Sequence, residues 1–260
     1  LGEGAGISDM DLRRLMVELE QLYFRDYANF WGEAVGQVAL PPINDAGEGA
    51  GQLAGLTSAN SPVLQLLVQV RENTRFPVVA DRADDAAASA EKLGGKLGKL
   101  AAAAADEASA MAKNLPDTAK KSLQRRFEPL HRLLDENNGP AADLTPALTA
   151  LNELQMQLSS LARSSAPEQA AFEMAKTRMS GQRDALSNLR NASNRLPRPV
   201  SVWFNVLAED TWRLVLNDSY QYLNQRYQSE LYSFYGKAIN KRYPFSAHST
   251  SDVAIASGRL

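Results

Sequence analysis

Apolar residues recur at steps of three and four positions along almost the whole chain, which is the period of one face of an α-helix. No segment shows the alternation of apolar and polar residues that is typical of a half-buried β-strand. The first periodic stretch runs from about Ser8 to Val38, and Pro41-Pro42 stops it. The pattern predicts an all-α multi-helix bundle with long N- and C-terminal helices and no substantial β-sheet.

Prolines and capping residues divide the remainder into further helices. These are predicted over residues 63–74, 117–135, 146–161, 165–195 and 200–242. Residues 43–60 are rich in glycine and other small residues and are interpreted as a loop with room for a short helical turn. Pro129 predicts a kink or a break in its helix. Two serines are followed three residues later by an acidic residue, as in a capping box: Ser8 with Asp11, and Ser165 with Glu168.

The composition changes in the middle of the chain, where twelve of the 27 residues from 86 to 112 are alanine. An alanine-rich helix forms readily but buries little surface. We expect either a weakly packed helix interrupted near Gly94-Gly95 or a disordered segment. The predicted division is an N-terminal helical part (1–82), the Ala-rich segment (83–116), a bundle with the long C-terminal helix (117–245) and a tail (246–260).

Charge and residue types exclude several functional classes. The 28 Lys and Arg residues are balanced by 30 Asp and Glu residues, so the net charge of −2 argues against a strongly basic nucleic-acid binder. Cysteine is absent, and the two histidines, His131 and His248, are far apart in sequence. The chain therefore offers little for a thiolate or histidine metal site or for a catalytic triad. No apolar run is long enough to cross a bilayer, so we expect no membrane insertion by this chain.

Catalytic motifs are also missing. Lys96 and Lys99 each follow a glycine, but leucine comes next and the first glycine of a phosphate-binding loop is absent. His131 falls on a helical stretch and is interpreted as a surface or packing residue. We therefore expect no enzyme activity, no catalytic residue, no cofactor and no metal.

Aromatic residues are concentrated near the C-terminus, where residues 200–245 hold eleven of the nineteen. They do not fit on one helical face, so this helix is expected to be contacted on more than one side. For any single tyrosine the chain's own core is the favoured contact. The alternative is a partner-binding surface formed by Tyr232, Tyr235, Tyr243 and Phe245, since tyrosine and phenylalanine are favoured at interfaces.

Three stretches of this sequence resemble the C-terminal periplasmic region of the IcmF/TssM family of the type VI secretion system. They are MDLRRLMVELEQLYFRDYANFW (10–31), SPVLQLLVQVRENT (61–74) and YQSELYSFYGKAINKRYPF (227–245). None of these motifs is catalytic, so the resemblance rests on packing pattern and order. It covers nearly the whole chain, although the Ala-rich part is similar only in composition.

The resemblance implies a periplasmic domain of an inner-membrane-anchored protein in a Gram-negative bacterium. Family members join a TssJ-type outer-membrane lipoprotein and a TssL-type inner-membrane protein in a membrane core complex, where they also self-associate. The lipoprotein is bound mainly through a β domain that usually follows the SDVAIA motif, whereas here the sequence ends at SGRL. The implied function is a non-catalytic periplasmic helical strut. The alternative is a soluble helical protein-protein binding module unrelated to secretion.

Overall fold

The computed structural model describes residues 8–75 and 118–240, and these are almost entirely helical. Within these two ranges the structure has no β-strand, only an isolated bridge between Leu134 and Pro140. The predicted all-α fold with long helices near both ends is confirmed. The backbone divides into two compact units, which are described separately.

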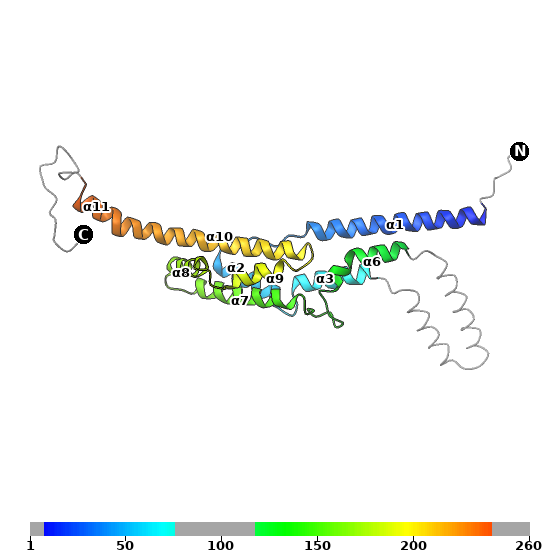
Figure 1. Cartoon of the computed structure of the whole chain (residues 1–260), viewed down its shortest axis with the longest axis horizontal. Coiled ribbons are helices and arrows are strands. Elements are labelled where there is room, and N and C mark those ends of the chain that lie inside the picture. The colour runs from blue at the N-terminus through cyan, green and yellow to red at the C-terminus, as the bar shows by residue number, and fades with distance from the viewer. Residues whose placement is uncertain (1–7, 76–117, 241–260) are drawn as a thin grey trace. The chain divides into compact units, whose positions relative to one another are not determined.

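The first unit contains the described residues of Leu1–Leu40, Ser58–Pro146 and Arg195–Ser201. Its helices are α1 (Asp9–Gln37), α3 (Pro62–Thr74) and α6 (Thr118–His131). Helix α6 packs against both α3 and α1 (Figure 1). The predicted cap of α1 is confirmed, because the Ser8 hydroxyl oxygen accepts a hydrogen bond from the Asp11 backbone N–H at 3.1 Å.

Leucine and valine side chains on α3 and α6 form most of the core of this unit. The buried members are Val63, Leu64, Leu67, Val70, Leu123, Phe127 and Leu130. Pro129 lies inside α6 without breaking it, and the helix ends two residues later, at His131. A proline near a helix end disturbs few backbone hydrogen bonds, so the helix continues past Pro129 and ends shortly after the position where the break was expected.

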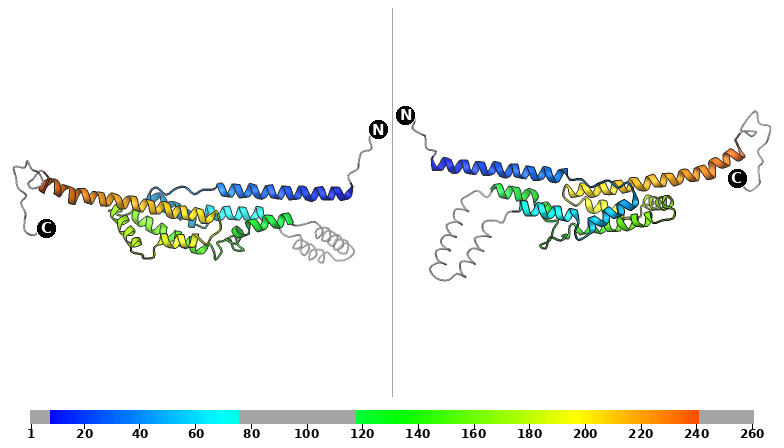
Figure 2. Two further views of the ribbon diagram at one scale, coloured as in Figure 1. Left: turned by 45° about the horizontal axis from the view of Figure 1, so that its top comes forward. Right: turned by 180° about the vertical axis from the view of Figure 1, so that it is seen from behind.

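The second unit contains the described residues of Pro41–Thr57, Ala147–Asn194 and Val202–Leu260. Its helices are α2 (Ala46–Thr57), α7 (Thr145–Ala162, from Ala147 on), α8 (Pro167–Met179), α9 (Ala185–Ser193), α10 (Val200–Arg226, from Val202 on) and α11 (Ser233–Ala238). The sequence places five leucines on one face of α7, Leu148, Leu151, Leu154, Leu158 and Leu161, and all of them except Leu148 are buried. Figure 2 shows α10 lying along the shorter helices of this unit and continuing past them.

Helix α2 occupies most of the segment interpreted as a loop, so that prediction was wrong. The Asp45 carboxylate caps the helix by accepting hydrogen bonds from the N–H groups of Gly47 and Glu48, at 2.8 and 3.0 Å. Gly49 faces the core so closely that a Cβ atom there would lie 2.6 Å from Ile43 Cγ2 and 3.0 Å from Leu158 Cδ1. The small residues that suggested a loop instead allow close helix packing.

The helix predicted over residues 165–195 is broken into α8 and α9. Gly181 has a φ of +80°, which residues other than glycine rarely adopt. The predicted Ser165 cap does not form, because α8 begins at Pro167 with Ala166 in the capping position. Met179, expected on the buried side, is 77% exposed next to the break.

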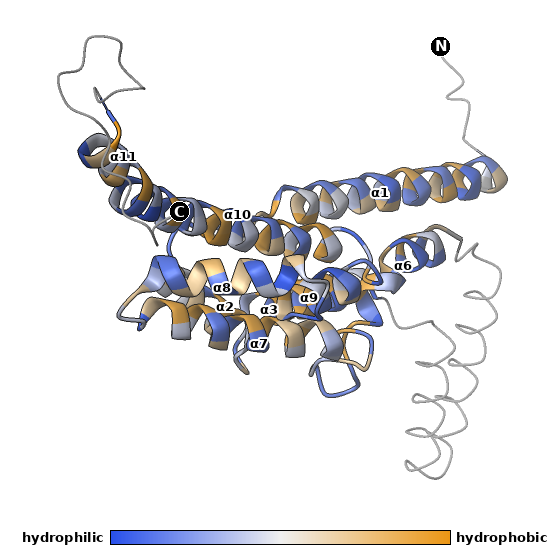
Figure 3. Ribbon diagram, turned by 60° about the vertical axis from the view of Figure 1, so that its left-hand side comes forward, coloured by the Kyte–Doolittle hydropathy of each residue, from blue (hydrophilic) through white to orange (hydrophobic). Residues whose placement is uncertain are grey.

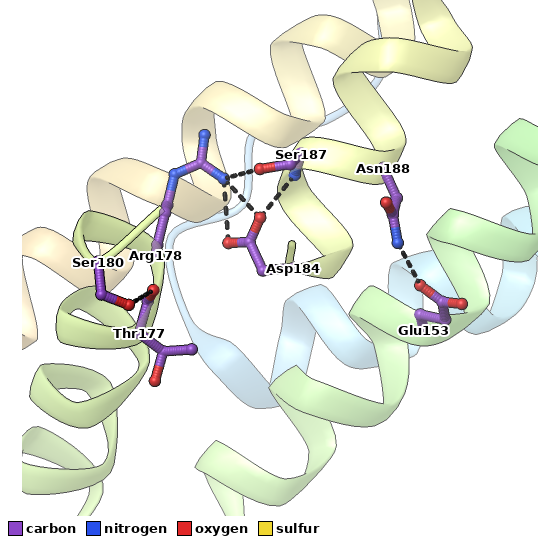
Figure 4. A network of polar contacts seen from close by, with 7 residues as sticks. All are labelled: Glu153, Thr177, Arg178, Ser180, Asp184, Ser187 and Asn188. Atoms are coloured by element: carbon purple, nitrogen blue, oxygen red, sulfur yellow. Dashed lines mark hydrogen bonds and ion pairs between the residues drawn. The ribbon is translucent and has the colours of Figure 1, made fainter. Parts of the chain in front are cut away.

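A polar cluster holds the two ends of this break together (Figure 4). The Arg178 guanidinium donates to the Asp184 carboxylate at 2.8 and 3.0 Å and to the Ser187 hydroxyl at 3.1 Å. Asp184 also accepts from the Ser187 backbone N–H at 2.8 Å and so caps α9. The same guanidinium lies over the Trp212 ring, 5.0 Å from its centroid. This arrangement links α8, α9 and α10.

The long C-terminal helix is continuous but not uniform. Between α10 and α11 the chain forms a π-helical segment, η1 (Tyr227–Tyr232). Arg226 and Glu230 form an exposed ion pair across its start, with N–O distances of 3.0 and 2.8 Å. The predicted helix is therefore confirmed as far as Ala238. The predicted domain boundaries at residues 82, 116 and 245 fall outside the described residues and stay predictions.

Candidate interaction surfaces

Exposed apolar side chains gather on two helices, one in each unit. The α1 stripe consists of Leu12, Leu15, Met16, Leu19, Leu22, Tyr23 and Phe30. The α10 stripe consists of Leu216, Tyr220, Leu223, Tyr227, Leu231, Phe234 and Tyr235. Figure 3 shows hydrophobic positions along the whole length of α1. Helices that are apolar on more than one side are normally covered on more than one side.

The α1 stripe lies opposite the face that the helix presents to its own unit. Phe24 and Ala28 are buried on that inner face, and the Tyr27 hydroxyl donates to the Asn73 carbonyl at 3.0 Å. Lys120 reaches the same side, 3.5 Å from the Glu20 carboxylate and over the Phe24 ring. At 3.6 residues per turn, the stripe residues fall on roughly the other side of the helix, and Leu19 is 65% exposed.

The α10 stripe belongs to a stretch that has no buried residue at all. Every residue from Tyr220 to Ala238 is exposed or only partly covered. Tyr227 and Tyr232 lie near each other across η1, with ring centroids 6.5 Å apart. Helices in proteins gain most of their stability from tertiary packing, so such a stretch is expected to gain stability from a partner.

Two of the four predicted partner-binding residues lie in this stretch. Tyr232 is 57% exposed and Tyr235 is 47% exposed, so the favoured expectation that each tyrosine contacts the chain's own core was wrong for these two. Tyr243 and Phe245 lie outside the described residues. Whether any of the four binds a partner stays a prediction.

Sequence reasoning found the apolar residues of α1 but assigned all of them to one face. The buried residues Phe24, Ala28 and Val35 are separated by four and seven residues, which keeps them on one face of the helix. The leucines from Leu12 to Leu22 follow the same step in a different register. The signal available in the sequence was that these two sets of apolar residues lie in different helical registers, and therefore on different faces of α1.

Ionisable groups inside the units have structural explanations. His131 is buried, and its Nε2 lies 2.6 Å from the Thr74 hydroxyl oxygen. Burial, together with the positive charges of Arg75 and Arg71, lowers the pKa of His131 to about 4, against a smaller opposing effect of Glu128. The imidazole is therefore neutral near pH 7 and serves in packing. Packing is one of the two roles that the sequence predicted for His131.

Two carboxylates in the second unit have shifted pKa values in opposite directions. Burial raises the pKa of Asp184, but the hydrogen bonds from Ser187 and Arg178 outweigh it, so the pKa ends below its usual value. Burial, with the nearby charges of Glu168 and Asp45, raises the pKa of Asp218. Among the described residues no three His, Cys, Asp or Glu side chains come together as a metal site.

Among the described residues of the first unit, a cavity of about 410 Å³ lies between α1 and α6. Phe24, Ala28 and Leu123 contribute apolar surface, and Arg25 and Arg126 contribute charge. The Arg126 guanidinium is already engaged by the Asn29 side chain at 2.7 Å. Ser122 adds a hydroxyl group to the lining, and no carboxylate belongs to it.

Comparisons with known proteins indicate what the chain is similar to. The family model IcmF-related, described as intracellular multiplication and human macrophage-killing, matches residues 1–75. The chain is also 24% identical over 252 residues to the type VI secretion system component TssM1 of Pseudomonas aeruginosa. The alignment covers 94% of this chain and 22% of that protein. Both similarities are to members of the IcmF/TssM family.

The chain spans about a fifth of the length of the relative it matches. The family-model match includes all of α1, and therefore the whole α1 stripe. No solved structure matches the chain. Across residues 8–75 and 118–240, no helix combines the length and the apolar character needed to cross a membrane.

Proposed function

We propose that the chain is a non-catalytic structural part of a type VI secretion membrane core complex. In this proposal it is a periplasmic helical strut between an inner-membrane anchor and an outer-membrane lipoprotein. The observation that carries the proposal is the pair of uncovered apolar stripes on helices of the two units. The similarity to a type VI secretion component over most of the chain supports the same assignment.

The proposed partners follow from the family. They are a TssJ-type lipoprotein, a TssL-type inner-membrane protein and further copies of the chain. The stretch from Tyr220 to Ala238 is the proposed contact for one of the two non-identical partners, because it carries the aromatic residues that dominate interface energies. The arrangement of the polar residues supports no catalytic role.

A co-purification experiment tests this function. The chain is tagged and expressed with the lipoprotein and the inner-membrane protein encoded beside it, in parallel with a version extended through the β domain typical of the family. We expect the inner-membrane protein to bind both versions and the lipoprotein to bind mainly the longer one. Capture of neither protein by either version contradicts the proposal.

A pair of matched variants assigns the surface. Tyr235→Asp with Leu231→Asp places two charges in the α10 stripe, and Met156→Asp with Met179→Asp places two charges on exposed methionines outside both stripes. Only the first pair is expected to reduce capture.

The second candidate function is a soluble helical binding module unrelated to secretion. The same exposed stripes favour it, because a partner helix can lie along either one. It predicts that neither secretion protein is captured while the chain still binds an amphipathic helix.

A further inference from the structure

Helix α1 has two apolar faces, and the described residues of its own unit cover only one. Helices α3 and α6 lie on the inner face, through the Tyr27–Asn73 hydrogen bond and the contacts of Lys120 with Glu20 and Phe24. The α1 stripe, on the other side, is exposed along its length.

The centre of the stripe has the spacing of a short coiled-coil seam. Leu12, Leu15, Leu19 and Leu22 are separated by three, four and three residues, which is the repeat that pairs two helices. The next position in this repeat is Asp26, which ends the seam. Met16, Tyr23 and Phe30 widen it on one flank, and the other flank carries three charged residues, Asp11, Glu18 and Arg25. The seam is about 15 Å long.

We propose that the α1 stripe pairs with the α1 stripe of a second copy of this chain, with the two helices antiparallel. In this arrangement Leu12 packs on Leu22 of the second copy, and Leu15 packs on Leu19 of the second copy. The inference rests on the proposed function in treating the chain as an assembly module. It adds the surface, the partner and the relative direction of the helices.

The charged flank favours a second copy in this direction. Asp11 lies opposite Arg25 of the second copy, and the two-fold symmetry repeats the attraction. Glu18 meets its own counterpart at the centre, but Arg14 already neutralises it within each helix at 3.2 Å. The ion pair that Arg25 now makes with Asp26 is exposed, so Arg25 can exchange it at little cost.

A parallel pair would have the opposite electrostatics. Asp26 would face Asp26 of the second copy at a seam position, where two like charges repel. Asp11, Glu18 and Arg25 would face the apolar flank instead of opposite charges. Both effects disfavour the parallel arrangement.

The first test measures the mass of the chain in solution by sedimentation over a range of concentrations. The wild-type chain is expected to dimerise. Leu15→Asp with Leu19→Asp is expected to weaken the dimer about a hundredfold, because the charges would be buried at the seam. Met156→Asp with Met179→Asp adds the same charges to other exposed positions and is expected to leave the dimer intact. Unchanged circular dichroism and melting of both variants show that the fold is retained.

A wild-type chain that stays monomeric at its highest soluble concentration overturns the inference. A dimer that survives Leu15→Asp with Leu19→Asp also overturns it. Neither result affects the proposed function, because this test contains no secretion partner.

The second test determines whether the two helices are antiparallel or parallel. The chain has no natural cysteine, so only the introduced cysteines can form a disulfide. Leu15→Cys and Leu19→Cys chains are prepared separately and oxidised alone or mixed. The antiparallel arrangement predicts efficient cross-linking only in the mixture. Efficient cross-linking of Leu15→Cys with itself would show a parallel pair and overturn the proposed geometry.

A charge exchange tests the register. Asp11 also accepts a hydrogen bond from the Ser8 hydroxyl at 2.6 Å, so the melting of each variant is measured beside its dimerisation. Asp11→Arg or Arg25→Asp alone is expected to weaken the dimer several-fold at low salt, and the double variant is expected to restore it. No restoration would contradict the proposed register.

Discussion

Helix α7 and the stretch from Tyr220 to Ala238 have similar lengths and the same helical period, yet their environments are opposite. In α7 a leucine every three or four residues is fully buried. In the C-terminal stretch the corresponding positions are exposed. The comparison shows that a periodic apolar face predicts a contact without saying whether the chain itself supplies it. Stability should therefore depend on α7, and assembly on the C-terminal stretch.

The largest difference is expected between two leucine variants. Leu154→Ala removes a fully buried side chain from α7 and is expected to lower the free energy of unfolding by about 3 kcal/mol. Leu231→Ala removes an exposed one and is expected to change it by less than about 0.5 kcal/mol. Urea unfolding measures both. An equal loss for Leu231→Ala would mean that the C-terminal stretch is covered within the chain.

The next largest difference extends the comparison to ion pairs. Arg178→Ala leaves the buried Asp184 carboxylate without its partner and is expected to destabilise the chain by about 2 kcal/mol. Arg226→Ala removes a fully exposed ion pair and is expected to leave the melting temperature unchanged. Similar melting shifts for the two variants would contradict the difference in burial.

His131 gives a further test of the difference between buried and exposed groups, because burial keeps its imidazole neutral. Its pKa is about 4 in the folded chain and near 6.5 when unfolded, so the unfolded chain binds more protons between these values. Stability is therefore lost as the pH falls through this window, by about 2 kcal/mol from pH 7 to pH 5.

The His131→Gln variant isolates this effect from that of the carboxylates. Urea unfolding at several pH values is expected to give a shallower acid slope for the variant than for the wild-type chain. Equal acid slopes for the variant and the wild-type chain would mean that His131 has the same pKa in the folded and the unfolded chain.

The smallest effect is expected from two glycines of α2. Gly49→Ala places a Cβ atom against Ile43 and Leu158 and is expected to cost about 1 kcal/mol. Gly51→Ala meets nothing within 4 Å and is expected to stabilise the helix by about 0.5 kcal/mol. Thermal melting distinguishes the opposite signs, and the same sign for both would argue against close packing of α2 on α7.

Most helices could be predicted because their period and prolines are local signals. Helices α1, α3 and α10 begin near Ser8, Pro62 and Val200, where the sequence indicated helix starts. Helix α2 was missed because its four glycines have low intrinsic helix preference, and tertiary packing compensates for this. The break at Gly181 was missed because the cluster of Arg178, Asp184 and Trp212 that stabilises it forms only in three dimensions.

The candidate surfaces were only partly predictable for a similar reason. The aromatic content of the C-terminal helix indicated Tyr232 and Tyr235, and the structure places both on an exposed surface. The period shows two apolar registers on α1 but does not say which of them the chain covers, because both consist of apolar residues at the same spacing. The position of α6 makes that distinction.

The π-helical segment η1 has a consequence for the evolution of this helix. A π-helical turn contains more residues than an α-helical turn, so loss of one residue between Tyr227 and Tyr232 could be absorbed by a return to α-helical hydrogen bonding. The helix before the deletion would keep its direction and packing. Phe234 and Tyr235 would keep roughly their present direction, because the wide turn and the residue that it accommodates would be lost together. A single codon deletion could thus leave both the hydrophobic interior and the aromatic end of the helix in place.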